Sequence, residues 1–314
     1  MNKTILTGAS GFLGSHIIEI LKEKGIPALS LLRETSSLRN LPSECEIARV
    51  DFMNPDSMAE AMSDADVIVH CAGATSASSQ EEFDRANALV TKNLLNAREK
   101  YSPGALFILI SSMAATGPDG NGPVTAYGRS KLLGELAVRE TENWIILRPS
   151  AIFGARDPAS IPVFRLALKG IFVSPWINRG GFCLTYVRDL AKLTAELPEH
   201  AEAVGKILEP SYGRLFSWKE FHEIMEKAAG SKILHLRIPP FLVIAAGYVS
   251  EAMAAVTRRT PFFCRDKSSE LLAVEWPLED GLTHRITGWK PSLTVEEAMV
   301  ETFRSITAAG DSKD

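Results

Sequence analysis

Short runs of consecutive apolar residues recur through the first half of the chain, and each precedes a stretch with helical character. Continuous apolar runs are typical of strands that are buried on both faces, whereas half-exposed strands alternate apolar and polar residues. Strands separated by helices join through right-handed crossovers and form a parallel sheet. The pattern therefore predicts a doubly wound α/β fold, with helices on both faces of the sheet and strands at residues 5–7, 28–32, 46–50, 67–70, 106–110 and 144–147.

Two helices stand out in this half: one follows a glycine-rich loop and is closed by Gly25, and the other covers about residues 83–100. Beyond Gly154 the regular alternation is lost and prolines become frequent, which predicts a smaller, irregular mixed region. The apolar stretch 239–257 is interrupted by Glu251 and diluted by small residues. We expect a packed helix there, with contact to a membrane surface as the less favoured alternative.

Composition and charge exclude several classes of protein. A chain of 314 residues, 46% of them hydrophobic, can bury a substantial core, so disorder is not expected. The net charge of −4 and the scattered basic residues give no electrostatic reason to bind nucleic acid. The amino end lacks a signal-peptide pattern, and the widely spaced cysteines indicate neither disulfides nor a zinc site. We expect a cytoplasmic protein with no metal and no transmembrane segment.

A glycine-rich loop, TGASGFLG at residues 7–14, joins the first strand to the first helix. Its spacing is GxxGxxG, shifted from the GxGxxG of the commonest dinucleotide fingerprint. Glycines allow a tight turn and a close approach of the backbone to a ligand, and the helix N-terminus offers free N–H groups to a pyrophosphate. The loop therefore predicts a dinucleotide-binding site rather than a plain turn.

Tyr127 and Lys131 form a YxxxK pair, whose side chains share one face of a helix. A free tyrosine has a pKa of about 10, too high for a good base at neutral pH. A neighbouring ammonium and an oxidised nicotinamide both favour the phenolate, so we expect a lowered pKa at Tyr127. Such a side chain can exchange a proton with a substrate oxygen. By itself the pair is a weak signal.

Two further segments make the pair specific. SSMAATG at residues 111–117 follows the strand at 106–110, and Asn87 lies in a helical stretch upstream. Together with the glycine loop, this order of motifs resembles the extended short-chain dehydrogenase/reductase family, part of the NAD-dependent epimerase/dehydratase superfamily. The resemblance implies a Rossmann domain in which Ser112 orients the substrate oxygen, Tyr127 and Lys131 handle the proton, and Asn87 supports a relay water near the lysine.

The resemblance also implies which residues bind the cofactor. Asp51 would bond the adenine amino group, although a role as a turn or helix-cap residue is left open. His70 is expected to be structural. Besides Tyr127 and Lys131, the implied cofactor-binding residues are Gly8, Ser10, Gly11, Phe12, Leu13, Gly14, Arg33, Ser36, Asp51, Phe52, Cys71, Ala72, Gly73, Pro149 and Ile152.

The end of the second strand bears on the choice of nicotinamide cofactor. NAD-preferring Rossmann proteins place an acidic residue there to bind the ribose 2′-OH. In this chain the position falls on Leu32, and Arg33 and Ser36 follow. A guanidinium binds a 2′-phosphate through paired hydrogen bonds, so we expect NADP. NAD stays open, because Glu34 is placed where it could reach the ribose.

Segments 147–154 and 185–191 also resemble this family, so the resemblance runs from Lys3 to about Lys192. It implies an NAD(P)-binding Rossmann domain at 1–155, to which about 184–204 return, and a mainly substrate-binding cap at 156–314. The stretch 238–263 resembles the dihydroflavonol reductase and 3β-hydroxysteroid dehydrogenase branch more than the sugar-nucleotide epimerases. Six aromatic residues of the cap are candidates for an apolar pocket, although most are expected to fill its core: Phe164, Phe172, Trp176, Phe182, Phe262 and Phe263.

Three functions are weighed. The first is an NADP(H)-dependent oxidoreductase that reduces a carbonyl or oxidises a secondary alcohol of a small-molecule substrate. The second is a nucleotide-sugar epimerase or dehydratase with tightly held NAD. The third, more distant, is a dinucleotide-sensing regulator without chemistry, against which the intact Ser112, Tyr127 and Lys131 argue. Family members commonly pair through helices of the first domain, so a homodimer is left open.

Overall fold

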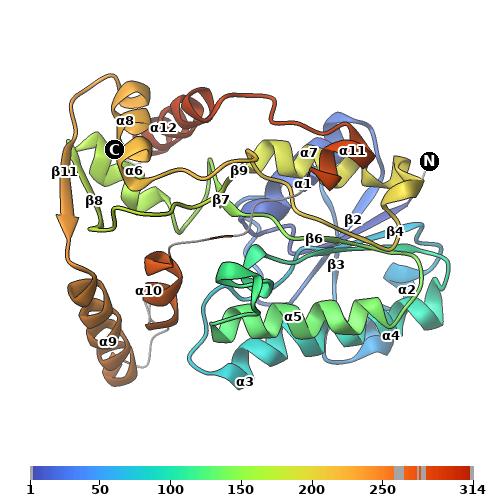
Figure 1. Ribbon diagram of the computed structural model, residues 1–314. Helices are drawn as coiled ribbons and strands as arrows, with labels where there is room; N and C mark the ends of the chain where they lie inside the picture. The colour runs from blue at the N-terminus through green and yellow to red at the C-terminus, as the bar shows by residue number, and fades with distance from the viewer. Residues whose placement is uncertain (1–2, 258–264, 274–275, 277–280, 312–314) are drawn as a thin grey trace.

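The computed structural model describes residues 3–257, 265–273, 276 and 281–311. Its central sheet consists of β1 (Thr4–Thr7), β2 (Ala28–Leu32), β3 (Glu46–Arg49), β4 (Val67–His70), β5 (Leu106–Ile110), β6 (Trp144–Leu147) and β10 (Lys206–Leu208). All neighbouring strands are parallel, in the order β10-β6-β5-β4-β1-β2-β3 (Figure 1). The predicted doubly wound Rossmann-type fold is confirmed, and each of the six predicted strands is present.

Successive residues of the central strands point to opposite faces of the sheet, so each face has its own core. Ile5 and Phe107 pack in one cluster, whereas their neighbours Leu6 and Ile108 pack in the other. Figure 1 shows the helices that cover these two faces. On one side lie α1 (Phe12–Glu23) and α7 (Val187–Glu196), and on the other α2 (Ala59–Met62), α4 (Val90–Tyr101) and α5 (Ala126–Arg139).

The helix predicted at 83–100 is present but divided. It begins as α3 (Gln80–Phe83), continues as one π-helical segment, η2 (Asp84–Leu89), and ends as α4. Such π-helical segments occur frequently at functional sites, and this one carries Asn87. The remaining short helices are η1 (Pro55–Met58), η3 (Met113–Ala115), η4 (Pro118–Gly120), η5 (Leu197–Glu199) and η6 (Ala201–Ala203).

The last strand of the central sheet, β10, follows a long segment that lies outside this sheet. After β6 the chain forms β7 (Ala151–Phe153), α6 (Ile161–Leu168), β8 (Ile171–Pro175) and β9 (Leu184–Tyr186), then α7, and only then β10. β7 and β9 pair in parallel outside the central sheet. The sequence did not predict β10, because three residues with a charged first position carry too little apolar signal to separate a strand from a turn.

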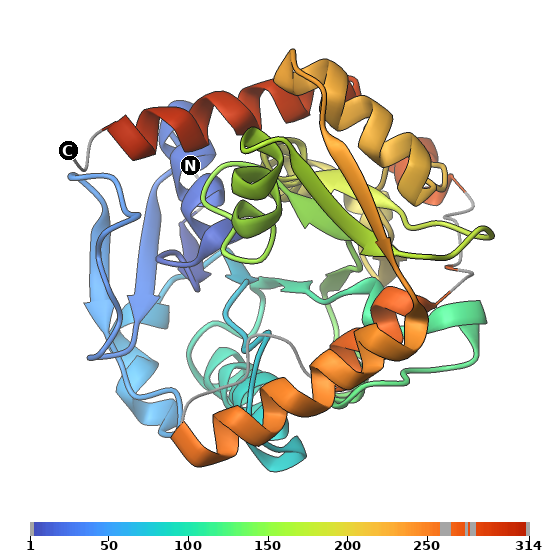
Figure 2. The same ribbon diagram turned by 90° about the vertical axis from the view of Figure 1, so that its left-hand side faces the viewer.

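The remaining elements gather around a second, two-stranded sheet of β8 and β11 (Leu234–Ile238). They are α8 (Trp218–Ala229), α9 (Pro240–Thr257), α10 (Arg265–Leu272) and α12 (Val295–Asp311); α11 (Leu282–Thr287) instead lies against η6, near α7 (Figure 1). α12 packs along α8 and α6 (Figure 2). Within the described ranges, no helix is long and apolar enough to span a bilayer.

The candidate pocket aromatics mostly fill this core, as expected. Phe164 lies against Phe303 with ring centroids 5.0 Å apart, and Phe182 lies 4.5 Å from Trp218. Trp176 differs from them, since 53% of it is exposed. Phe262 and Phe263 lie outside the described residues.

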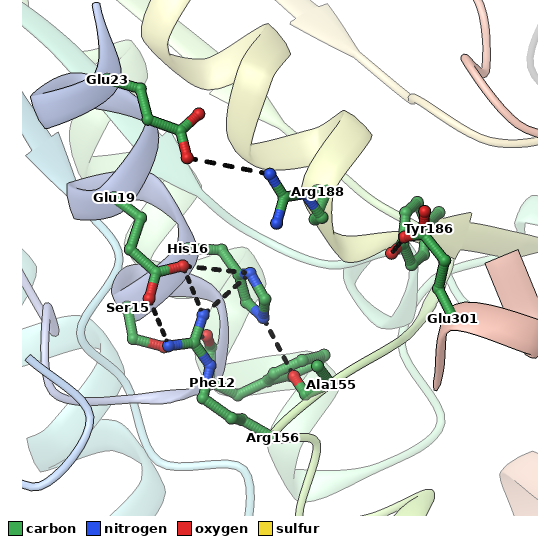
Figure 3. Close-up of polar contacts among 10 residues, drawn as sticks. All are labelled: Phe12, Ser15, His16, Glu19, Glu23, Ala155, Arg156, Tyr186, Arg188 and Glu301. Atoms are coloured by element: carbon green, nitrogen blue, oxygen red, sulfur yellow. Dashed lines mark hydrogen bonds and ion pairs between the residues drawn. The ribbon is translucent and has the colours of Figure 1, made fainter. Parts of the chain in front are cut away.

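Helix α1, which follows the glycine loop, is tied to the chain after β7 by a partly buried polar cluster (Figure 3). Arg156 donates to both carboxylate oxygens of Glu19, at 2.6 and 2.7 Å, and to His16 Nδ1 at 3.0 Å. His16 Nε2 lies 3.0 Å from the Ala155 carbonyl, which can only accept, so this nitrogen donates. Burial lowers the pKa of His16 to about 4, which keeps the ring neutral so that Nδ1 can accept. Arg156 therefore serves structure here.

Candidate active site

The glycine loop turns tightly between β1 and α1 and lies against the loop after β4. Gly8 has a φ of +75°, and a Cβ atom there would lie 2.6 Å from the backbone nitrogen of Ala72. A Cβ atom at Gly14 would lie 2.0 Å from the Gly8 carbonyl oxygen. No side chain caps α1 at Gly11 and its first turn carries no acidic residue; the Gly14 backbone N–H bonds Cys71, so the N-terminus of the helix before Gly14 is the part that can face an anion. This cradle fits a dinucleotide pyrophosphate.

Gly8→Ala is expected to weaken both the fold and cofactor binding. The left-handed backbone costs alanine about 1–3 kcal/mol, and the Cβ atom also displaces the Ala72 backbone. Gly25→Ala is the matched control, because Gly25 has a φ of +66° but no atom within 4 Å of the added Cβ. Urea unfolding and NADPH fluorescence titration should show that only G8A loses affinity. Equal NADPH binding by both variants would contradict the cradle.

The other loop residues divide between core and surface. Leu13 is 6% exposed and packs in the core, whereas Ser10 and Phe12 remain partly exposed. The Ser10 carbonyl accepts a hydrogen bond of 3.3 Å from Asn40 Nδ2, so the segment after β2 closes over the loop.

Arg33 and Ser36 lie in a turn directly after β2, where the sequence placed them. Arg33 is exposed, and among the described residues its guanidinium makes no hydrogen bond or ion pair. The turn is held by Arg49 at the end of β3, which donates to the backbone carbonyls of Arg33 at 2.5 Å, Glu34 at 3.2 Å and Ser36 at 3.3 Å. Sequence reasoning missed the role of Arg49 in this turn. Its position at the end of the strand next to β2 could have indicated that role.

Asp51 and Phe52 follow β3 in a tight turn. Asp51 Oδ1 accepts a hydrogen bond of 2.9 Å from the Met53 backbone, so one carboxylate oxygen serves the turn. Phe52 is only 7% exposed and packs in the core, which leaves little of its ring for a cofactor. Asp51 therefore stabilises the turn, as one of the two roles considered from the sequence requires. Binding of adenine by Asp51 and Phe52 stays a prediction.

His70 is buried and bonded through both ring nitrogens, as expected of a structural residue. Thr91 Oγ1 donates to the Asn87 carbonyl at 2.5 Å, so it must accept from His70 Nε2, which lies 3.0 Å away. His70 Nδ1 then accepts from Thr7 Oγ1 at 2.7 Å. Burial lowers the pKa of His70 to about 3, in keeping with this neutral form. The chain of bonds links the end of β1 to the π-helical segment.

Ser112, Tyr127 and Lys131 come together at the carboxyl end of β5. Ser112 precedes η3, and its hydroxyl accepts a hydrogen bond of 3.1 Å from the Ala114 backbone. A side-chain hydrogen bond joins Ser112 to Tyr127, the second residue of α5. Lys131 lies one turn further and donates to the Ile110 carbonyl at 2.6 Å. The structure thus gathers the three residues that the motifs selected.

The protonation states differ from the expectation of a lowered tyrosine pKa. Loss of hydration raises the pKa of Tyr127 to about 12, against the opposing effect of the Ser112 hydrogen bond. Burial lowers the pKa of Lys131 to about 8. The phenol is therefore protonated at neutral pH in the chain alone, because its surroundings penalise the phenolate more than nearby groups favour it.

Asn87 is buried at 3% exposure and lies beside this site. Its side-chain oxygen accepts from the Ala74 backbone at 2.8 Å, and its amide donates to the Ala74 carbonyl at 3.0 Å and to Ser130 at 2.8 Å. A Cβ atom at Gly73 would lie 2.9 Å from this oxygen and 3.8 Å from the Lys131 amine. Asn87 thus fixes the loop after β4 next to the lysine, and a role in a water relay stays a prediction.

The other predicted residues lie on the same edge of the sheet. Cys71 and Ala72 continue from β4, and the Ala72 backbone donates to Thr7 Oγ1 at 3.1 Å. Pro149 follows β6, and its carbonyl accepts from the Met113 backbone at 3.0 Å. Ile152 lies in β7 and is partly exposed. Because parallel strands end at the same edge, these loops lie at the edge of the sheet where open α/β sheets bind their ligands.

Sequence reasoning missed the residues that hold α5 in place. A Cβ atom at Gly128 would lie 2.3 Å from the Ala114 carbonyl, so this glycine lets Tyr127 approach Ser112. Glu135 is fully buried and accepts from Arg148 Nε at 2.9 Å and Nη2 at 2.5 Å, with a further short bond from Ser111. Gly128 lies inside a helix, and such a glycine could have indicated a close approach of another segment. The ion pair of Glu135 and Arg148 has no sequence spacing that would have indicated it.

Helix α10 contributes two carboxylates at the start of α5. Asp266 accepts from the Ala126 backbone at 2.5 Å, and Glu270 accepts from Thr125 Oγ1 at 2.9 Å. Both bonded residues immediately precede Tyr127. Helix α10 therefore contacts the N-terminus of the helix that carries the tyrosine.

Comparison with known proteins identifies the family. The profile of the NAD dependent epimerase/dehydratase family matches residues 4–207, which is more than half of the chain. The chain therefore belongs to this family, whose members are enzymes that use a nicotinamide dinucleotide, and the resemblance inferred from the motifs is confirmed.

The chain is also similar to two curated proteins and one solved structure. Ceramide reductase of Caulobacter vibrioides is 29% identical, covering 91% of this chain and 95% of that protein. The decarboxylating sterol-4-alpha-carboxylate 3-dehydrogenase of Candida albicans is 23% identical, covering 94% and 95%. The UDP-glucose 4-epimerase of Thermotoga maritima has the same fold, with a TM-score of 0.77 at 16% identity, covering 98% of this chain and 99% of that one.

Proposed function

We propose that the protein is an NADP(H)-dependent oxidoreductase that reduces a carbonyl or oxidises a secondary alcohol. The observation that carries this proposal is the meeting of Ser112, Tyr127 and Lys131 beside a glycine cradle at one edge of the sheet. The bound nicotinamide supplies or accepts the hydride. Side chains of this protein orient the substrate and transfer the proton.

The proton is handled at Tyr127 Oη. In reduction the phenol is protonated at neutral pH, since its pKa is raised to about 12, and it donates to the oxygen that gains negative charge. Ser112 lies within hydrogen-bonding reach of the same phenol and orients the substrate oxygen against it. Lys131, held on the Ile110 carbonyl, supplies positive charge next to the loop after β4.

The preference for NADP rests on two guanidinium groups. Arg49 orders the turn after β2 through three carbonyls, and this leaves the exposed Arg33 side chain uncommitted at the strand end. A 2′-phosphate would satisfy Arg33 through paired, charge-assisted hydrogen bonds. The residues at this edge fit NADP better than NAD, because Leu32 cannot bind a ribose hydroxyl.

Arg33→Ala is expected to raise the Kd for NADPH by about 10- to 100-fold, the loss of a charge-assisted hydrogen bond pair, and to leave the Kd for NADH unchanged. Arg139→Ala serves as the control, because Arg139 is an exposed arginine in the last turn of α5. Fluorescence titration with both cofactors makes the comparison. An equal loss for NADPH and NADH, or no loss at all, would refute the assignment of Arg33.

The substrate proposed is apolar. Support comes from the relatives named for ceramide and a sterol carboxylate, each matched over more than nine-tenths of this chain. The cap, mainly residues 156–314, would hold it. A nucleotide-sugar epimerase is the alternative, and tightly bound NAD that purifies with the protein would favour it. We place the enzyme in the cytoplasm and leave a homodimer as a proposal that molecular-mass measurement in solution tests.

A further inference from the structure

Helix α9 has an unusual surface for a helix at the edge of a protein. Its buried positions, Val243 and Gly247, form a narrow stripe four residues apart. Its exposed positions are apolar as well, and the largest exposed fractions are 67% at Phe241, 62% at Met253 and 58% at Val249. The outward side of α9 between Phe241 and Met253 is therefore mainly apolar, and its one charged residue, Glu251, is partly exposed and paired with Arg265.

Helix α8 of the same cap shows what a solvated surface looks like here. Its exposed positions are Lys219, Glu223 and Lys227, all of them charged and spaced four residues apart. Helix α9 lacks this pattern of charged residues. Its outward side is therefore not the polar surface expected of a helix that faces only water. Strand β11 leads directly into α9 (Figure 2) and continues the apolar surface, since two of its leucines are exposed: Leu234 is 61% and Leu236 is 43% exposed.

The exposed charges on α10, which packs against α9, are basic: Arg265 and Lys267 are exposed, whereas the acidic residues of α10 are partly buried and bonded to the start of α5. Exposed Arg237, near the end of β11 and just before α9, lies over the ring of exposed Trp176. The single acidic residue of α9, Glu251, is paired with Arg265 at 2.7 Å.

We propose that the outward side of α9, together with the outward leucines of β11, docks on the surface of an anionic lipid bilayer. An apolar surface bordered by basic residues fits the interfacial region, where apolar side chains enter the acyl boundary and cations contact lipid phosphates. A second copy of this chain carries the same positive border, so self-association through this surface is opposed by like charge.

The docking surface lies one helix away from the proposed catalytic tyrosine. Glu251 of α9 accepts from the backbone and the side chain of Arg265, at 2.8 and 2.7 Å, which joins α9 to α10. Helix α10 in turn bonds Thr125 and Ala126, next to Tyr127. Docking would therefore bring the mouth of the site to the bilayer, from which an apolar substrate could enter. This delivery rests on the proposed function, whereas docking itself does not.

Vesicle sedimentation tests docking without any turnover. The full-length protein is mixed with vesicles of phosphatidylcholine alone, or of phosphatidylcholine with phosphatidylglycerol. We expect binding to the anionic vesicles, weaker binding to the neutral ones, and loss of binding as salt is raised. In F241E/M253E, each added negative charge is expected to weaken partition about fivefold, or about thirtyfold together.

I47E/V204E is the matched control, because Ile47 and Val204 are exposed apolar residues of the central-sheet region, 41% and 38% exposed. It should bind as the wild type does, and circular dichroism checks that both double variants are folded. Absence of vesicle binding, or equal binding by F241E/M253E, overturns the proposal. A wild-type dimer that F241E/M253E converts to a monomer, with no vesicle binding, overturns it in favour of a second copy. Loss of docking with NADPH oxidation intact would leave the proposed chemistry standing.

Discussion

Tyr127→Phe is expected to reduce kcat by about 10²–10⁴-fold, because it removes the proton donor and leaves the ring in place. The phenol lies beside Ser112, and its pKa of about 12 keeps it protonated for reduction. The ring of Phe83, 6.0 Å from that of Tyr127, packs equally well against phenylalanine. The measurement is NADPH consumption with any ketone that the wild type reduces.

Two comparisons make this result specific. Tyr101→Phe removes a hydroxyl that bonds Asp56 on the surface, far along α4, and should leave kcat unchanged. The Kd for NADPH, measured by fluorescence, should change little in Tyr127→Phe, which separates lost chemistry from lost binding. If Tyr127→Phe turns over like the wild type, the tyrosine does not transfer the proton and the proposed mechanism fails.

Arg148→Ala is expected to lower the free energy of unfolding by about 3–5 kcal/mol, the usual cost of leaving a buried charge without its partner. Glu135 is fully buried, and Arg148 supplies two of its hydrogen bonds. Glu135 lies one turn after Lys131 on α5, so activity should fall as well. Urea unfolding followed by tryptophan fluorescence measures the loss.

A double variant decides whether the isolated charge is the cause. E135L/R148M replaces the pair by apolar side chains of similar size and should recover most of the lost stability, since such replacements are often neutral. Lys219→Ala, which removes one partner of an exposed ion pair with Glu223, should leave the unfolding midpoint unchanged. Equal instability in R148A and E135L/R148M would mean that packing, rather than an unpaired charge, determines the effect.

The sequence predicted the parts of the molecule whose signal is local. Strand β5, for example, is fully buried and consists of five apolar residues. The glycine loop and the YxxxK pair each lie within eight residues of chain. Resemblance to a family then ordered these local signals along the chain. The six central strands and the gathering of Ser112, Tyr127 and Lys131 were therefore within reach of sequence reasoning.

What was missed depends on contacts between distant residues. Arg49 meets Arg33 only because β2 and β3 are neighbours, and Glu135 meets Arg148 only after α5 packs on the sheet. The raised pKa of Tyr127 is likewise a property of the assembled surroundings, not of the i, i+4 spacing. Helix α9 was expected to be packed, yet most of its apolar side chains face outward, because composition does not reveal which neighbours are present.

The late position of β10 has a consequence for how the protein is made. Strand β6 gains its outer neighbour only from residues Lys206–Leu208, about sixty residues after β6 itself. A ribosome that has just completed α7 has therefore released a sheet whose β6 edge still carries unpaired N–H and C=O groups. Nascent chains that stall at this point would expose an apolar edge to one another, so slow translation before residue 206 should favour aggregation over folding.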